Sequence, residues 1–314
     1  MLYFVMSASA QQQNCTDDSI KSWLSYLASD KMKGRNNGSK EIEEVAAWLS
    51  TMYKQYDLQE FARLPKYFQP YYLSEDSSFI HKNVIGYIPA NNEANIDGPY
   101  VILSAHFDHI GISRYPVDGD SIFNGADDNA SGIVTLLTIA KNLCEREVRP
   151  DCPIVFAAFS NEERGMRGSS YFCKSEIIPI QKIKVVVNFE MLSHSEEFGK
   201  HKYYITGPDY SNLQDIVMEF NEDKEWKIAK PGNIVNMLYR MSDNYSFVIQ
   251  ANSASFCVSA HTIATSVGLQ SHVHKVYDEI DFVDFENMNS VVENLTQLVI
   301  YLASKQVAIN CKKK

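Results

Sequence analysis

Apolar residues recur at helical spacing in two segments near the N-terminus. In the second segment, Ile42, Val45, Leu49 and Met52 follow one another at intervals of three or four residues. This spacing places them on one face of an amphipathic helix. The pattern therefore predicts two N-terminal helices, over Asp17 to Ser29 and Ser39 to Tyr56.

Short apolar runs then alternate with segments of helical periodicity. The runs predict strands at Tyr67 to Leu73, Asn83 to Ile88, Tyr100 to Ser104, Ile154 to Phe159, Lys184 to Phe189, Tyr203 to Thr206 and Ala254 to Val258. Helices are predicted at Ser131 to Leu143, Gly168 to Lys174, Ser211 to Asp223, Asp243 to Ile249 and Asn287 to Ser304. Because helices recur between strands, we expect an α/β fold: a three-layer α/β/α sandwich with a mostly parallel, mixed central sheet.

Length and charge indicate the number of domains and limit the kinds of partner that the protein binds. A chain of 314 residues without a break in composition predicts one large domain, over residues 11–314. The formal net charge is -10, and no basic cluster exceeds Lys312 to Lys314, which argues against a nucleic-acid partner. No apolar stretch is long enough to span a membrane. The oligomeric state stays open, and a monomer is compatible with the sequence.

The N-terminus resembles the end of a secretory signal. The apolar run Leu2 to Met6 is followed by the small residues Ser7 to Ala10, with an A-x-A-like cleavage position before Gln11. We therefore interpret residues 1–10 as the remnant of a signal peptide and expect a periplasmic or secreted protein.

Six cysteines are present, and none forms a C-x-x-C pair. Cys144 and Cys152 flank the connection between a predicted helix and the next strand. A disulfide between these two residues and buried free thiols are both compatible with the sequence.

Three consecutive segments carry residues typical of a metal site. They are His106-Phe107-Asp108-His109, Asp127-Asp128-Asn129-Ala130-Ser131-Gly132 and Asn161-Glu162-Glu163-Arg164-Gly165. Strand-like runs precede the first and the third, so we expect these segments to meet at one edge of a sheet. Imidazole nitrogen and carboxylate oxygen suit zinc, and a carboxylate between two such segments can bridge two ions. Of two adjacent glutamates only one need bind metal, which leaves the other as a general base.

Each motif also has a simpler interpretation when it is read alone. A His-x-Asp pair is most often a surface or strand-end pair, and the Glu162-Glu163 pair could be a solvated turn. The Asp127 to Gly132 run is a good helix start, in which Asn129 or Ser131 serves as the cap. A simpler interpretation is harder to find for Glu190. It ends an apolar strand, where a buried unpaired carboxylate would be costly.

Five ordered segments together resemble the di-zinc aminopeptidases that include bacterial leucyl aminopeptidase and aminopeptidase Y. Glutamate carboxypeptidase, the transferrin receptor and glutaminyl cyclase are relatives on the same fold. The matching segments are S-A-H-F-D-H-I-G, N-G-A-D-D-N-A-S-G, V-F-A-A-F-S-N-E-E-R-G-M-R-G-S, V-V-N-F-E-M-L and V-H-K-V-Y-D-E-I-D. They run from Ser104 to Asp281, and a looser likeness covers Lys33 to Lys40. Some relatives carry an inserted protease-associated domain, for which the interval Leu58 to Ile80 is too short.

The resemblance implies a role for each matching polar residue. It implies two Zn²⁺ ions, with His106 and Glu190 on one, Glu163 and His274 on the other, and Asp128 bridging both. It further implies that Asp108 orients His106, that Glu162 is the general base, and that the peptide bond from Asp128 to Asn129 is cis. We expect Asn129 to be held by its side chain or by helix-cap contacts rather than to touch substrate.

Three positions depart from the family pattern. Glu190 stands where Asp is usual, and Val273 stands where many relatives have a Tyr that could stabilise an oxyanion. The usual Ser-Asp-His is replaced by a segment in which Asn244 occupies the place of the histidine. Tyr239 or Tyr245 is a candidate replacement for the missing donor.

The favoured function is therefore a zinc-dependent exopeptidase, an aminopeptidase that removes N-terminal residues from peptides. The expected chemistry uses a hydroxide shared by the two ions, with Glu162 as its base. A glutaminyl cyclase using one zinc and a non-catalytic binding protein are the alternatives. The sequence leaves open dipeptidase or carboxypeptidase activity and the preferred residue, whose pocket we expect in loops at Met191 to Glu197, Lys230 to Met241 and Ser259 to Leu269.

Overall fold

The computed structural model describes residues 8–74, 76–91, 98–260 and 272–312. Its main sheet has eight strands in the order β1-β2-β6-β3-β7-β10-β8-β9. β6, β3, β7 and β10 run parallel to one another. β1 pairs antiparallel with β2, β2 with β6, and β8 with β10, whereas β8 pairs in parallel with β9. The expected mixed, mostly parallel sheet is thus confirmed. The strands are β1 (Phe68–Leu73), β2 (Asp76–Ile88), β3 (Tyr100–His106), β6 (Ile154–Phe159), β7 (Ile183–Phe189), β8 (Lys202–Ile205), β9 (Lys227–Ile228) and β10 (Ser255–Ser259).

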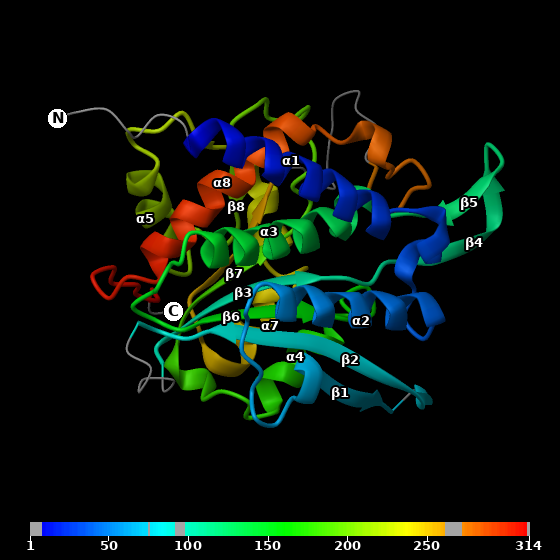
Figure 1. Cartoon of the computed structure of the whole chain (residues 1–314), viewed down its shortest axis with the longest axis horizontal. Helices are drawn as coiled ribbons and strands as arrows, with labels where there is room; N and C mark the ends of the chain where they lie inside the picture. The colour runs from blue at the N-terminus through cyan, green and yellow to red at the C-terminus, as the bar shows by residue number, and fades with distance from the viewer. Residues whose placement is uncertain (1–7, 75, 92–97, 261–271, 313–314) are drawn as a thin grey trace.

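Helices cover both faces of this sheet, which confirms the three-layer sandwich (Figure 1). One face carries α1 (Ala8–Leu27), α2 (Lys40–Gln55), α3 (Gly132–Glu145) and α8 (Phe285–Leu302). The other face carries α4 (Arg167–Lys174) and α7 (Asn244–Ala251). The remaining helices are α5 (Leu213–Phe220) and α6 (Val235–Leu238), with single turns η1 (Asp30–Arg35), η2 (Pro65–Tyr67), η3 (Ala126–Ser131), η4 (Ile180–Lys182), η5 (Gly232–Ile234) and η6 (Ile280–Phe282).

The central strands are apolar on both sides because each side faces a core. In β6, Ile154 and Phe156 pack into the core beneath α1, α2, α3 and α8, whereas Val155 and Phe159 pack into the core beneath α4 and α7. All six residues of β6 are buried. A continuous apolar run is typical of a parallel strand covered on both faces, which is why this strand was predicted with its observed bounds.

The hairpin of β4 (Gly111–Val117) and β5 (Asp120–Phe123) was not predicted. It projects from the sandwich at the right of Figure 1. Most of its side chains are exposed or half-buried, and Tyr115 is 82% exposed. A strand pair that faces solvent on both sides leaves no periodic apolar signal, so the sequence pattern could not mark it.

Two predictions about the chain outside the sheet can be compared with the structure. Cys144 and Cys152 are free thiols, so the disulfide between them is not formed. The Cys144 sulfur instead lies 3.8 Å from an Asp57 carboxylate oxygen, at the exposed end of α3. The apolar run Leu2 to Met6 lies outside the described residues. In the part of the chain that the structure describes, no helix combines the length and the apolarity needed to cross a bilayer.

Candidate active site

The predicted site residues converge at the carboxyl ends of three neighbouring parallel strands. His106 is the last residue of β3, Glu162 and Glu163 follow β6, and Glu190 follows β7. Asp128 reaches the same place from η3, just before α3. The sheet edge therefore gathers the motifs as the sequence predicts.

The loops that carry Glu162, Glu190 and His274 turn sharply at or next to these residues. Asn161 (φ +60°), immediately before Glu162, Met191 (φ +48°), immediately after Glu190, and His274 (φ +55°) all have left-handed backbone conformations. Non-glycine residues adopt such conformations rarely, and they concentrate at functional sites where the surrounding structure enforces them.

His106, Asp128 and Glu190 form a first group of donor atoms. The Nε2 atom of His106 lies 2.8 Å from Glu190 Oε1 and 3.3 Å from Asp128 Oδ1. The Oε2 atom of Glu162 lies 3.9 Å from the same nitrogen. Glu162 thus borders the first group without lying among its closest atoms.

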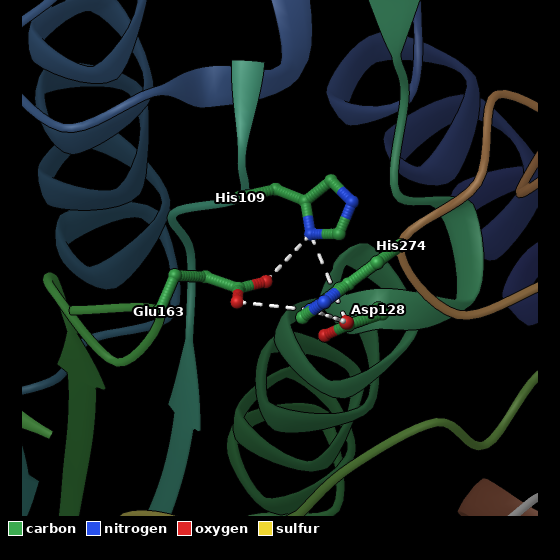
Figure 2. Close-up of side chains that lie close together, drawn as sticks. All are labelled: His109, Asp128, Glu163 and His274. Atoms are coloured by element: carbon green, nitrogen blue, oxygen red, sulfur yellow. Dashed lines mark hydrogen bonds and ion pairs between the residues drawn. The ribbon is translucent and has the colours of Figure 1, made fainter. Parts of the chain in front are cut away.

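Asp128 also belongs to a second group, with Glu163, His274 and His109 (Figure 2). The Nε2 atom of His274 lies 3.0 Å from Glu163 Oε2 and 3.3 Å from Asp128 Oδ2. The Nδ1 atom of His109 lies 2.8 Å from Glu163 Oε1 and 3.8 Å from Asp128 Oδ2. The two Asp128 oxygens therefore face different groups, as a bridging carboxylate requires.

His109 was not among the predicted site residues. It stands next to Asp108 in the H-F-D-H segment, and its side chain is fully buried. The only hint in the sequence that His109 belongs to the site is its position, three residues after His106. Whether that imidazole points at the site depends on the path of the loop, which spacing alone does not define.

Asp108 contacts His106 through its backbone carbonyl. The His106 Nδ1–H donates to the Asp108 backbone carbonyl at 3.0 Å, whereas the Asp108 carboxylate lies 3.7 Å away. That carboxylate instead accepts the backbone N–H groups of Glu162 (3.1 Å) and Glu163 (3.3 Å) and the side-chain amide of Asn37 (2.5 Å). The carbonyl contact fixes the tautomer of His106 and leaves its Nε2 facing the first group.

The longer side chain of Glu190 is held by its own partners. Its Oε2 atom accepts hydrogen bonds from the Ser242 hydroxyl (2.5 Å) and the Asn188 amide (2.9 Å). Because these bonds engage Oε2, Oε1 is the oxygen that faces His106. The extra methylene is therefore accommodated, with one carboxylate oxygen left for the site.

The peptide bond from Asp128 to Asn129 is cis, as expected. The Asn129 amide donates to the Phe189 carbonyl at 2.9 Å, and its oxygen accepts the Gly132 N–H at 3.0 Å, which caps α3. A Cβ atom at Gly132 would lie 2.3 Å from that oxygen. Asn129 is thus held by side-chain and cap contacts, and position 132 has no room for a side chain.

Asp278 holds the backbone of Asp128. Its two carboxylate oxygens accept the N–H of Asp127 (2.7 Å) and the N–H of Asp128 (2.9 Å). Burial raises the pKa of Asp278 to about 8, with the charge of Asp127 adding to the shift. Asp278 lies four residues beyond His274, so one segment supplies a donor to the second group and also fixes Asp128.

We expect Asp278→Asn to weaken both the fold and metal binding. An amide side chain can accept only one of the two N–H groups and places an N–H donor against the other. The free energy of unfolding should fall by about 1–3 kcal/mol, and zinc affinity by roughly 10–100-fold. Denaturant unfolding and zinc titration measure the two effects.

Asp284→Asn is the matched control for this substitution. Asp284 caps α8 by accepting the Asn287 N–H at 3.0 Å, and asparagine caps helices equally well. Zinc affinity should not change in this variant. Equal zinc affinity in Asp278→Asn and the wild-type protein would contradict the positioning role of Asp278.

The pKa values of Glu162 and Asp128 shift in opposite directions. Burial raises the pKa of Glu162 well above its ordinary value, although His106 opposes this shift. Burial also acts against charge on Asp128, but hydrogen bonds from His106 and His274 hold the pKa of Asp128 well below its ordinary range. Asp128 is therefore suited to remain an anionic ligand, and Glu162 to take up a proton.

The donor set fits divalent zinc. Four carboxyl groups, those of Asp128, Glu162, Glu163 and Glu190, surround a space that lies mostly out of water. Hydrogen bonds to Asp128 and Glu163 raise the pKa of His274 to about 10, which shows how strongly this surrounding favours positive charge. A divalent cation satisfies the same demand and displaces such protons. Histidine nitrogens beside carboxylate oxygens are typical zinc ligands.

The candidate oxyanion donors have other contacts. The Tyr239 hydroxyl lies 3.2 Å from Ser255 Oγ, and the ring of Tyr245 packs edge-on against that of Tyr239. These contacts give no support to either tyrosine as a substitute donor. Of the loops expected to form the specificity pocket, residues 261–269 lie outside the described part of the chain.

An α/β/α sandwich with adjoining histidine–carboxylate groups at the carboxyl ends of its strands is typical of metal-dependent peptidases. Within this class, the chain belongs to peptidase family M28, whose sequence profile matches residues 83–299. The chain is 28% identical to the uncharacterized protein YfbL of Escherichia coli over 52% of this chain and 44% of that protein. It is 24% identical to a probable leucine aminopeptidase of Trichophyton verrucosum over 68% of this chain and 55% of that protein. The chain thus spans about half the length of these relatives.

Solved structures share the fold at low sequence identity. The LapA aminopeptidase of Legionella pneumophila aligns with a TM-score of 0.67 at 17% identity, covering 97% of this chain and 78% of that chain. A glutaminyl cyclase of Porphyromonas gingivalis aligns with a TM-score of 0.68 at 16% identity, covering 93% and 98%. These similarities confirm the predicted fold.

Proposed function

We propose that this chain is a zinc-dependent aminopeptidase that releases N-terminal residues from peptides. The observation that carries this proposal is the pair of donor groups that share Asp128, with Glu162 beside them. In the first group the closest atoms belong to His106, Asp128 and Glu190, which leaves Glu162 available for proton transfer. Membership of a peptidase family is consistent with this division of roles.

The proposed ligands are His106, Asp128 and Glu190 at one position, and Asp128, Glu163 and His274 at the other. When bound, zinc ions supply a Lewis acid for the scissile carbonyl and lower the pKa of water. Glu162 accepts the proton of the attacking water at its carboxylate and then donates it to the leaving amine. Burial raises the pKa of Glu162 well above its ordinary value, which strengthens its hold on the proton that it takes up.

Two alternatives share this fold. A glutaminyl cyclase closes an N-terminal glutamine, and the chain aligns with cyclase structures. Such an enzyme uses one zinc, whereas the two donor groups here favour two. A non-catalytic binding protein would have no need of an intact base beside the donor groups. The aminopeptidase is therefore the function that the site supports best.

We expect metal removal to abolish peptidase activity and zinc to restore it. Amino-acid anilides, free dipeptides, carboxypeptidase substrates and N-terminal glutaminyl peptides should be assayed on one preparation, with its metal content measured. Activity on anilides that falls to background with a chelator and returns with zinc supports the proposal. Cyclisation without anilide hydrolysis, or hydrolysis that persists in the metal-free protein, would contradict it.

We also propose a periplasmic or secreted location, supported by the apolar run Leu2 to Met6 and the small residues that follow it. N-terminal sequencing of protein recovered from the native organism tests this proposal. A mature terminus at Gln11 supports it, and protein that retains Met1 contradicts it.

A further inference from the structure

The imidazole ring of His109 is buried and tightly packed. His109 lies three residues beyond the end of β3, and its backbone N–H donates to the Arg35 carbonyl at 3.4 Å. Gly125 packs against the imidazole so closely that a Cβ atom there would lie 2.6 Å from a ring carbon. The side chain is fully buried. The ring is thus fixed in one orientation, with Nδ1 turned to the second group (Figure 2).

The polar contacts of the His109 ring are all with members of the second group. Nδ1 contacts Glu163 at 2.8 Å and Asp128 at 3.8 Å. Nε2 is buried and has no hydrogen-bond partner among the described residues. His109 therefore does not link the site to another polar network, and its contacts are those of a member of the group.

The distances in the second group bracket the spacing of zinc ligands. Bonds of 2.0–2.2 Å in a tetrahedron place neighbouring ligand atoms about 3.3–3.6 Å apart. The contacts among His109, Asp128, Glu163 and His274 range from 2.8 to 3.8 Å. All four donor atoms lie within 4.8 Å of one another.

We propose that His109 is a fourth protein ligand of the ion held by Asp128, Glu163 and His274. This inference rests on the proposed function and makes the two metal positions unequal. Four protein ligands complete a tetrahedral zinc site, whereas three leave a position open, as in catalytic sites. The second position is therefore expected to hold its ion more firmly than the first position, which lies beside Glu162.

His109→Asn tests this assignment. The asparagine amide lies near the place of Nδ1 and can still donate to Glu163, but it is a poor zinc ligand. Metal content after dialysis against graded chelator should show one firmly held ion in the wild-type protein. That ion should bind at least about 10–100-fold more weakly in His109→Asn. His106→Asn should instead lose the other ion, and His201→Asn, at a histidine outside both groups, should lose neither.

X-ray absorption of the zinc-loaded wild-type protein gives a measurement that needs no variant. With His109 bound, the two ions average about 1.5 imidazole ligands each, and without it about one each. Two retained ions with wild-type affinity in folded His109→Asn, or an average of one imidazole per ion, overturns the inference but leaves the aminopeptidase standing. A wild-type protein that binds no zinc overturns both.

Discussion

Glu162→Gln is expected to keep both metal ions and to lose nearly all turnover. The amide has almost the same size as the carboxylate but cannot accept a proton from water. General-base catalysis typically contributes about 10²–10⁴-fold, so kcat should fall by that factor. Initial rates on an anilide substrate and metal content measured on the same sample test the expectation.

The same substitution at the next residue provides the control. Glu163 lies among the donor atoms of the second group, so Glu163→Gln should lose metal as well as turnover. If Glu162→Gln turns over at a near-normal rate with its metal in place, Glu162 is not the base. If both variants lose metal equally, the division of roles between the two glutamates is wrong.

The largest effect on stability is expected from Arg35→Met. The guanidinium of Arg35 is fully buried, and burial lowers its pKa only to about 10, so it stays charged at neutral pH. It donates to four backbone carbonyls, those of Leu27 (2.7 Å), Phe107 (3.0 Å), Asn124 (2.6 Å) and Gly125 (3.0 Å). Methionine fills a similar volume but leaves these carbonyls unpaired, so the free energy of unfolding should fall by roughly 3–5 kcal/mol.

Arg146→Met is the surface counterpart. Arg146 pairs with Glu293 where both side chains are partly exposed, and surface pairs contribute about 0–1 kcal/mol. Denaturant unfolding of both variants separates the effect of burial from the loss of an arginine. Equal destabilisation of the two variants would contradict the role assigned to Arg35.

The sequence predicted those parts of the fold that bury a regular pattern. β6 and α2 were placed within one residue of their observed ends, because the first is apolar throughout and the second has a single apolar face. The start of α1 at Ala8 was missed, since the polar run Gln11 to Asn14 carries no apolar periodicity. The solvent-facing β4–β5 hairpin was missed for the same reason.

The site was predicted as a set of residues but not as a set of contacts. The ordered motifs pointed to Asp128 and Glu163, which the structure brings together. They did not assign His109 to this group, nor did they show that the Asp108 carboxylate supports the two glutamates while its backbone carbonyl contacts His106. Both facts depend on loop paths set by distant contacts, such as the bonds from Arg35 and Asn37. Such contacts leave no periodic trace in a sequence.

The bond between Asp278 and Asp128 joins residues 150 positions apart. During synthesis, the residues of the first group all leave the ribosome by Glu190, well before His274 and Asp278. Because a domain folds as a unit, Asp128 gains this backbone support only once the C-terminal segment is present. The second group of the site therefore forms only in a chain that has been made as far as Asp278.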